Sequence, residues 1–173
     1  MEDKTEYIIR PWKMTDSRRL AENANNIKIW KNLRDYFPYP YKESDARAFI
    51  RSVVTKKNTE DFAIVVNEEA VGGIGYIPGT DIERLNAEIG YWLSERYWGK
   101  GIMSNALNDA IDYIFNNTNI IRLFTSVLSY NHASVKVLEK NGFRRVGVQT
   151  KAAIKNGKIV DMYSYELLKE WRK

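Results

Sequence analysis

The segment Arg96–Gly101 carries residue types that suit the binding of an anion. It follows an apolar, strand-like run and precedes a long amphipathic helical pattern. The first N–H groups of a helix have no intrahelical partner, and the helix dipole favours negative charge beside them. Gly99 and Gly101 let an anion approach the backbone without meeting a Cβ, while Arg96 and Lys100 add positive charge. The turn therefore predicts a phosphate site.

The helix after this turn has a clear apolar face, which would pack on an apolar layer and hold the helix N-terminus still. Polar residues lie mostly off that face. The apolar residues recur at spacings of three and four and are Met103, Ala106, Leu107, Ala110, Ile111, Ile114 and Phe115.

Several motifs in this order resemble the GNAT N-acetyltransferase family over about residues 7–168. They are Ala87-Glu-Ile-Gly-Tyr-Trp-Leu, the Arg96-x-x-Gly-x-Gly turn, Asn131-His-Ala-Ser and Glu139-Lys-Asn-Gly-Phe. The resemblance is nearest to the Rim-type branch, which acetylates N-terminal amines of ribosomal proteins. It implies that the turn holds the pyrophosphate of acetyl-coenzyme A (acetyl-CoA).

The resemblance also implies the fold, which belongs to the α/β (α+β) class. We expect a twisted, mostly antiparallel mixed sheet of about seven strands, flanked by helices and splayed in a V. The strands that part would end near Leu93 and Val127, and in the family the cofactor lies in that V.

The resemblance implies a cofactor set that is partly backbone. The backbone of Trp92 and Leu93 would pair with the pantetheine amides as an added strand does, and the Leu93 N–H would serve as an oxyanion donor. Ser104 suits either a phosphate oxygen or a polar surface. The full expected set is Trp92, Leu93, Arg96, Trp98, Gly99, Lys100, Gly101, Ile102, Ser104 and Asn131.

Glu88 is the candidate base. An acceptor amine has a pKa of about 10.4 in water, so a base helps it react at neutral pH. Strand alternation places Glu88 on the face opposite Ala87 and Ile89, and the resemblance assigns a glutamate at this position to the amine proton. The alternative is a half-exposed strand carboxylate paired with Arg122 or Lys158.

Ser134 is the candidate acid, because the resemblance places the serine of Asn-x-x-Ser near the coenzyme sulfur. The alternative is a serine in the first helical turn that bonds its own backbone. Asn131 is the expected N-cap of that helix and, by resemblance, a ligand of the pantetheine arm. His132, the only histidine, is expected at the surface.

One position departs from the Rim-type pattern. Ala153 stands where that branch usually carries a second glutamate. The base role therefore returns to Glu88, and the inference that this chain shares the branch's specificity for ribosomal proteins is weakened. The aromatic stretch from Tyr36 to Tyr41 falls where the family builds its acceptor groove, and its rings suit a pocket for a peptide N-terminus or an amine.

Composition points to an ordinary globular enzyme. The length of 173 residues suits one domain, residues 1–173. Without cysteine there is no disulfide, thiolate metal site or cysteine nucleophile, and one histidine disfavours a zinc site or a serine–histidine triad. We found neither a membrane-spanning run nor a signal peptide, so we expect a cytoplasmic protein without metal or membrane partner.

The net charge of +5 suits solubility or attraction of an anionic ligand. Basic residues are scattered, which speaks against a nucleic-acid partner.

Local patterns predict the remaining elements. A helix capped by Thr15 or Asp16 would reach Ile27, and another would start with Ser44 as its cap. Asn156-Gly157 predicts a type I′ hairpin turn. Strands are expected at residues 7–10, 61–66, 70–77, 87–93, 121–127, 143–149 and 159–168.

The sequence thus predicts an acetyl-CoA-dependent N-acetyltransferase in which an amine attacks the thioester directly. The leading acceptor is a protein N-terminal amine. Polyamines or aminoglycosides are alternatives, as is a non-catalytic CoA-binding module of the same fold. The chain would act as a monomer or homodimer.

Overall fold

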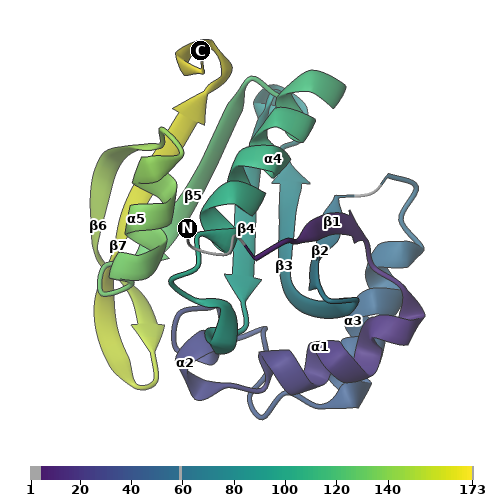
Figure 1. The fold of residues 1–173 in the computed structure, drawn as a ribbon. Coiled ribbons are helices and arrows are strands. Elements are labelled where there is room, and N and C mark those ends of the chain that lie inside the picture. The colour runs from purple at the N-terminus through teal and green to yellow at the C-terminus, as the bar shows by residue number, and fades with distance from the viewer. Residues whose placement is uncertain (1–4, 59, 173) are drawn as a thin grey trace. The chain divides into compact units, whose positions relative to one another are not determined.

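The computed structural model describes residues 5–58 and 60–172 and contains one seven-stranded sheet with helices (Figure 1). The strands are β1 (Ile8–Pro11), β2 (Asp61–Val66), β3 (Glu69–Pro78), β4 (Asn86–Leu93), β5 (Arg122–Leu128), β6 (Arg144–Lys155) and β7 (Lys158–Leu168). The α-helices are α1 (Ser17–Ala24), α2 (Ile27–Trp30), α3 (Glu43–Val54), α4 (Ile102–Asn117) and α5 (His132–Lys140). Short 3-10 turns are η1 (Met14–Asp16), η2 (Asp81–Glu83), η3 (Glu95–Tyr97) and η4 (Lys169–Trp171).

The strand order is β1-β2-β3-β4-β5-β7-β6. β1–β2, β2–β3, β5–β7 and β6–β7 pair antiparallel, whereas β4 and β5 pair parallel. The parallel pairing joins Asn86–Glu88 to Arg122–Phe124, while β4 continues to Leu93 and β5 to Leu128. The mixed, mostly antiparallel sheet predicted from the sequence is confirmed.

The chain forms two compact units. The first contains residues up to Gly75 together with Tyr91–Ala106, and the second contains Tyr76–Gly90 together with the chain from Leu107 onward. β3, β4 and α4 each begin in one unit and end in the other.

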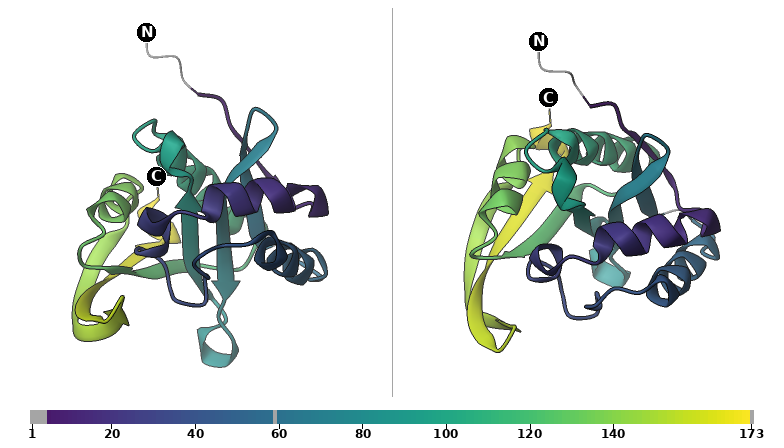
Figure 2. Two further views of the ribbon diagram at one scale, coloured as in Figure 1. Left: turned by 90° about the horizontal axis from the view of Figure 1, so that it is seen from below. Right: turned by 60° about the horizontal axis from the view of Figure 1, so that its bottom comes forward.

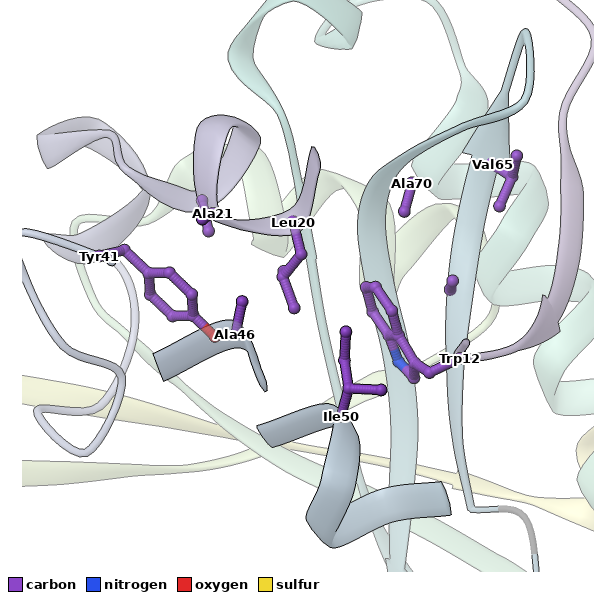
Figure 3. Packing of buried hydrophobic residues seen from close by; sticks show 10 residues of the cluster. Trp12, Leu20, Ala21, Tyr41, Ala46, Ile50, Val65 and Ala70 are labelled. Carbon is purple, nitrogen blue, oxygen red and sulfur yellow. The ribbon is translucent and has the colours of Figure 1, made fainter. Parts of the chain in front are cut away.

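In the first unit, α1 and α3 lie side by side (Figure 2) and bury their apolar faces with Trp12 and with side chains of β2 and β3. Trp12 packs edge-on against Phe49, with ring centroids 5.6 Å apart. Burial of these apolar surfaces provides most of the packing energy, at about 25 cal/mol per Å². The labelled residues of this cluster are Trp12, Leu20, Ala21, Tyr41, Ala46, Ile50, Val65 and Ala70 (Figure 3).

In the second unit, β6 and β7 form a long twisted hairpin (Figure 2). Its turn has left-handed φ angles of +51° at Asn156 and +73° at Gly157, as the predicted type I′ turn requires. β6 extends to Lys155, beyond the predicted end at Gln149. The prediction stopped short because the last residues of the strand are mostly exposed and lack an alternating apolar pattern.

The helix after the glycine turn is confirmed as α4. All seven residues of its predicted apolar face are buried, whereas Asn108, Asp109 and Asp112 are exposed. This face anchors the helix along its length, and the first turn of the helix is held with it.

Two helix boundaries differ from the predictions. α1 ends at Ala24, and Ile27 begins a separate helix whose N-cap, Asn26, accepts a hydrogen bond from the Lys28 N–H. α3 begins at Glu43, so Ser44 lies inside the helix, and the Asp45 carboxylate instead accepts the Lys42 N–H. No helix in the described part of the chain has the length and apolarity to cross a bilayer.

Candidate active site

The turn between β4 and α4 contains backbone N–H groups that have no hydrogen-bond partner in the described part of the chain. Among the described residues, the N–H groups of Gly99 and Gly101 donate no hydrogen bond within the chain. Both glycines have left-handed φ angles, +74° and +75°, and a Cβ at either would meet nothing within 4 Å. Ile102 and Met103 follow in the first turn of α4, where N–H groups lack intrahelical partners. Unpaired amides at a helix N-terminus are suited to bind an anion.

Arg96 in this turn is held by neighbours. One guanidinium nitrogen donates to Asn23 Oδ1 at 2.9 Å and lies 3.4 Å from Glu69 Oε2. Lys100 is exposed, with its Nζ 5.3 Å from the centroid of the Tyr97 ring. The predicted positive charges are therefore present at the turn, and that of Arg96 is partly balanced by Glu69.

We expected the backbone groups at the end of β4 to be free to bind a ligand, and one of them, the carbonyl oxygen of Leu93, is not free. Trp98 Nε1 donates to the Leu93 carbonyl oxygen at 2.8 Å, so this acceptor is already occupied. The Ser94 N–H in turn donates to Val71 O at 2.8 Å. The indole of Trp98 thereby ties the turn to the strand, a role that the sequence did not indicate.

Trp92 is supported by glycines whose role was missed in the sequence. A Cβ at Gly72 would lie 2.6 Å from Trp92 O, and one at Gly73 would lie 2.8 Å from Trp92 Nε1. Only glycine allows β3 to approach Trp92 this closely. The ring of Phe37, from the segment between α2 and α3, packs against the Trp92 ring, with centroids 5.9 Å apart.

Ser104, in the first turn of α4, is buried rather than part of a polar surface. Ile102 is also buried, so its side chain anchors the helix and only its backbone is suited to contact a ligand. The predicted coenzyme residues from Trp92 to Ser104 all belong to the first compact unit.

Glu88 belongs to the second unit and occupies the predicted strand face. Ala87 and Ile89 are buried, while Glu88 is half-buried and stands opposite Phe124 in the parallel pair. Arg122, one of the partners considered for Glu88, donates to Glu166 at 2.9 Å.

Asn131 and Ser134 are brought together at the start of α5, in the same unit as Glu88. Asn131 Oδ1 accepts the Ser134 N–H at 3.2 Å, which confirms the predicted N-cap. The side chain of Ser134 is half-buried, and His132 is exposed as expected. Ala153 lies on β6 opposite Val160.

The aromatic stretch of the first unit has both buried and exposed rings. Tyr41 is buried and packs on Phe37, with centroids 4.7 Å apart, and burial followed by the charge of Asp45 raises the pKa of Tyr41 to about 12. Tyr36 is 82% exposed and Tyr39 is 45% exposed. The phenol of Tyr41 therefore stays neutral, and the exposed rings are the ones that can meet an acceptor.

No group of His, Asp or Glu side chains within the described ranges could hold a metal ion. By residue type, the Glu88 carboxylate can accept a proton and the Ser134 hydroxyl can donate a hydrogen bond.

Comparison with known proteins shows that this chain is similar to acetyltransferases. The family model for the acetyltransferase (GNAT) domain matches residues 7–144. The probable N-acetyltransferase YjcK of Bacillus subtilis is 39% identical over 165 residues, which cover 91% of this chain and 90% of that protein. The uncharacterized N-acetyltransferase p20 of Bacillus licheniformis is 36% identical over 110 residues, 62% of this chain and 61% of p20.

Among solved structures, the ribosomal-protein-S5-alanine acetyltransferase of Vibrio fischeri superposes with a TM-score of 0.82 at 25% identity. The superposition covers 96% of each chain.

Proposed function

The chain belongs to the GNAT acetyltransferase family, and from this premise we propose that it transfers the acetyl group of acetyl-CoA to the N-terminal amine of a protein. Acetyl-CoA-dependent N-acetyl transfer follows from family membership. The protein N-terminal acceptor is the finer part of the proposal, and similarity to a ribosomal-protein acetyltransferase supports it.

One observation carries the cofactor assignment. The N–H groups of Gly99 and Gly101 have no acceptor among the described residues, and they adjoin the N-terminus of α4. Anions bind at such sites because the dipole and the unpaired donors act together. In this proposal the pyrophosphate of CoA accepts these hydrogen bonds.

The proposed chemistry has no covalent enzyme intermediate. Glu88 takes the proton of the acceptor amine, and the amine nitrogen attacks the thioester carbon. The Leu93 N–H stabilises the oxyanion that forms. The carbon–sulfur bond then breaks, the acetyl group stays on nitrogen, and the Ser134 hydroxyl donates a hydrogen bond to the departing thiolate.

The binding arm of the test uses thermal unfolding with CoA. At 100 times its Kd, a ligand stabilises by about 2.7 kcal/mol, which corresponds to a rise in Tm of roughly 5–10 °C for a chain of this size. We expect Gly99→Trp to abolish the rise in Tm, because the tryptophan side chain fills the open space beside the amides of the turn. Gly157→Trp is the matched control, since Gly157 also has a left-handed φ and open space around it. An unchanged rise in Gly99→Trp removes this turn from the site.

The turnover arm measures thiol release with four acceptors: a peptide with a free N-terminus, the same peptide N-acetylated, a polyamine and an aminoglycoside. We expect release with the free peptide alone. Faster turnover of the polyamine or aminoglycoside would overturn the acceptor assignment. Silence across all four, with CoA binding intact, would identify a non-catalytic binding module instead.

A further inference from the structure

The turn that bears Gly99 and Gly101 has little packing of its own. Arg96, Trp98 and Lys100 are exposed, as are both glycines, and glycine permits many backbone conformations. A ligand site gains affinity when its donors are fixed before binding. The contacts that fix this turn therefore bear on how well it binds.

Asn23 makes one of these contacts from the last turn of α1. It is 5% exposed, and its Nδ2 donates to the carbonyl oxygens of Arg19 and Ala70, each at 3.0 Å. Both amide hydrogens are thus directed at backbone acceptors, so Oδ1 is left to accept from Arg96 at 2.9 Å. The side chain joins α1, the start of β3 and the turn.

Glu69 makes the second contact, from the first residue of β3. Its two carboxylate oxygens lie 3.2 Å from an Arg19 nitrogen and 3.4 Å from an Arg96 nitrogen. The Glu69 side chain is 29% exposed and that of Arg96 is 57% exposed. Asn23 on α1 and Glu69 on β3 thus contact the same guanidinium nitrogen of Arg96.

The residue before Arg96 is held in a similar way. Glu95 accepts from Asn26 Nδ2 at 2.8 Å and forms an ion pair with Lys28. Two adjacent residues of opposite charge are therefore held in place. Glu95 is held by Asn26 and Lys28, and Arg96 is held by Asn23 and Glu69. All these residues belong to the first compact unit.

We propose that Asn23 and Glu69 are positioning residues for CoA, which hold Arg96 and through it keep the amides of the turn in their binding conformation. This inference rests on the proposed function, because it takes the pyrophosphate as the ligand of the turn. Neither residue touches the coenzyme, and both act through Arg96.

The test compares Asn23→Ala and Glu69→Gln with matched controls. Asn141→Ala removes another buried asparagine that donates to a backbone carbonyl, and Glu22→Gln neutralises another glutamate paired with Arg19. Calorimetry measures the Kd of CoA and of 3′-phosphoadenosine 5′-diphosphate, which carries the diphosphate without the pantetheine arm. We expect about a tenfold weaker affinity for both ligands in the two test variants and unchanged affinity in the controls.

A kinetic readout separates positioning from general loss of structure. In the test variants, KM for acetyl-CoA rises with kcat preserved, whereas kcat/KM for acetyl-pantetheine, which lacks the diphosphate, stays unchanged. In an Arg96→Ala background, adding Asn23→Ala weakens binding no further. If Asn23→Ala fails to fold, the partly exposed Glu69→Gln still decides the question.

The outcomes are distinct. Wild-type affinity in both test variants, or an equal loss with acetyl-pantetheine, overturns this inference and leaves the proposed function standing. Absence of CoA binding by the wild-type protein overturns the cofactor assignment and this inference with it.

Discussion

Glu88 is the polar member of a strand segment whose immediate neighbours are buried. Ala87 is 0% exposed and Ile89 is 1% exposed, while Glu88 is half-buried on the opposite face. A carboxylate in this position is shielded from solvent only in part. Its environment is therefore compatible with the base role that the family resemblance implied.

We expect Glu88→Gln to lower kcat by about 100-fold, within the range usual for loss of a general base. The affinity for CoA, measured by calorimetry, should stay within twofold because the amide keeps the size of the side chain. Glu83→Gln, an exposed glutamate in η2, serves as the control. Full turnover by Glu88→Gln would exclude Glu88 as the base.

At the scale of elements, an ion pair joins β1 to the start of α1. Arg10 donates two hydrogen bonds of 2.8 Å to the carboxylate of Asp16, which also accepts the Lys13 N–H at 2.8 Å. Burial raises the pKa of Asp16, but the hydrogen bonds from Arg10 and Lys13 outweigh this effect and leave the pKa below its usual value. The junction is therefore stabilised by the charged form of Asp16.

We expect Asp16→Asn to lower the free energy of unfolding by about 2 kcal/mol, because it leaves the partly buried Arg10 without its charge partner. Glu22→Gln, which breaks exposed pairs with Arg18 and Arg19, should cost less than about 1 kcal/mol. Urea unfolding at pH 7 measures both. A cost for Asp16→Asn no larger than that of the control would show that the junction contributes little.

The same variant has a defined pH dependence. Because the pKa of Asp16 is lowered by folding, its contribution is present above the unfolded pKa of about 3.9 and is lost as the pH falls through the lower folded value. The difference in unfolding free energy between wild type and Asp16→Asn should therefore shrink below about pH 4. A difference that stays constant down to pH 2 would contradict the lowered pKa.

At the scale of the whole molecule, the two compact units share three elements. β3, β4 and α4 each cross from one unit to the other, so loss of either unit removes part of an element from its neighbour. On this ground we propose that residues 1–173 behave as one cooperative domain.

Cooperative unfolding can be tested with two probes. Trp12, Trp30, Trp92 and Trp98 lie in the first unit, so tryptophan fluorescence reports mainly on it, while hydrogen exchange of β6 and β7 amides reports on the second. We expect both probes to give one coincident urea transition. Transitions separated along the urea axis would show two independent domains.

Much of the fold could be predicted from local patterns in the sequence. The apolar face of α4, the turn at Asn156-Gly157 and the N-cap at Asn131 were predicted and are confirmed. Each depends on backbone geometry and on residues a few positions apart. Boundaries such as the end of α1 at Ala24 were missed, because an apolar pattern does not specify where one helix stops and the next begins.

The sequence by itself determined the glycine turn, its charges and the strand face of Glu88, since dihedral preference and the period of a strand act within short segments. Only the tertiary structure revealed that Arg96 is held by Asn23 and Glu69, which precede it by 73 and 27 residues. It also revealed that Gly72 and Gly73 make room for Trp92. Contacts of this kind depend on how distant elements pack, and no spacing along the chain encodes them.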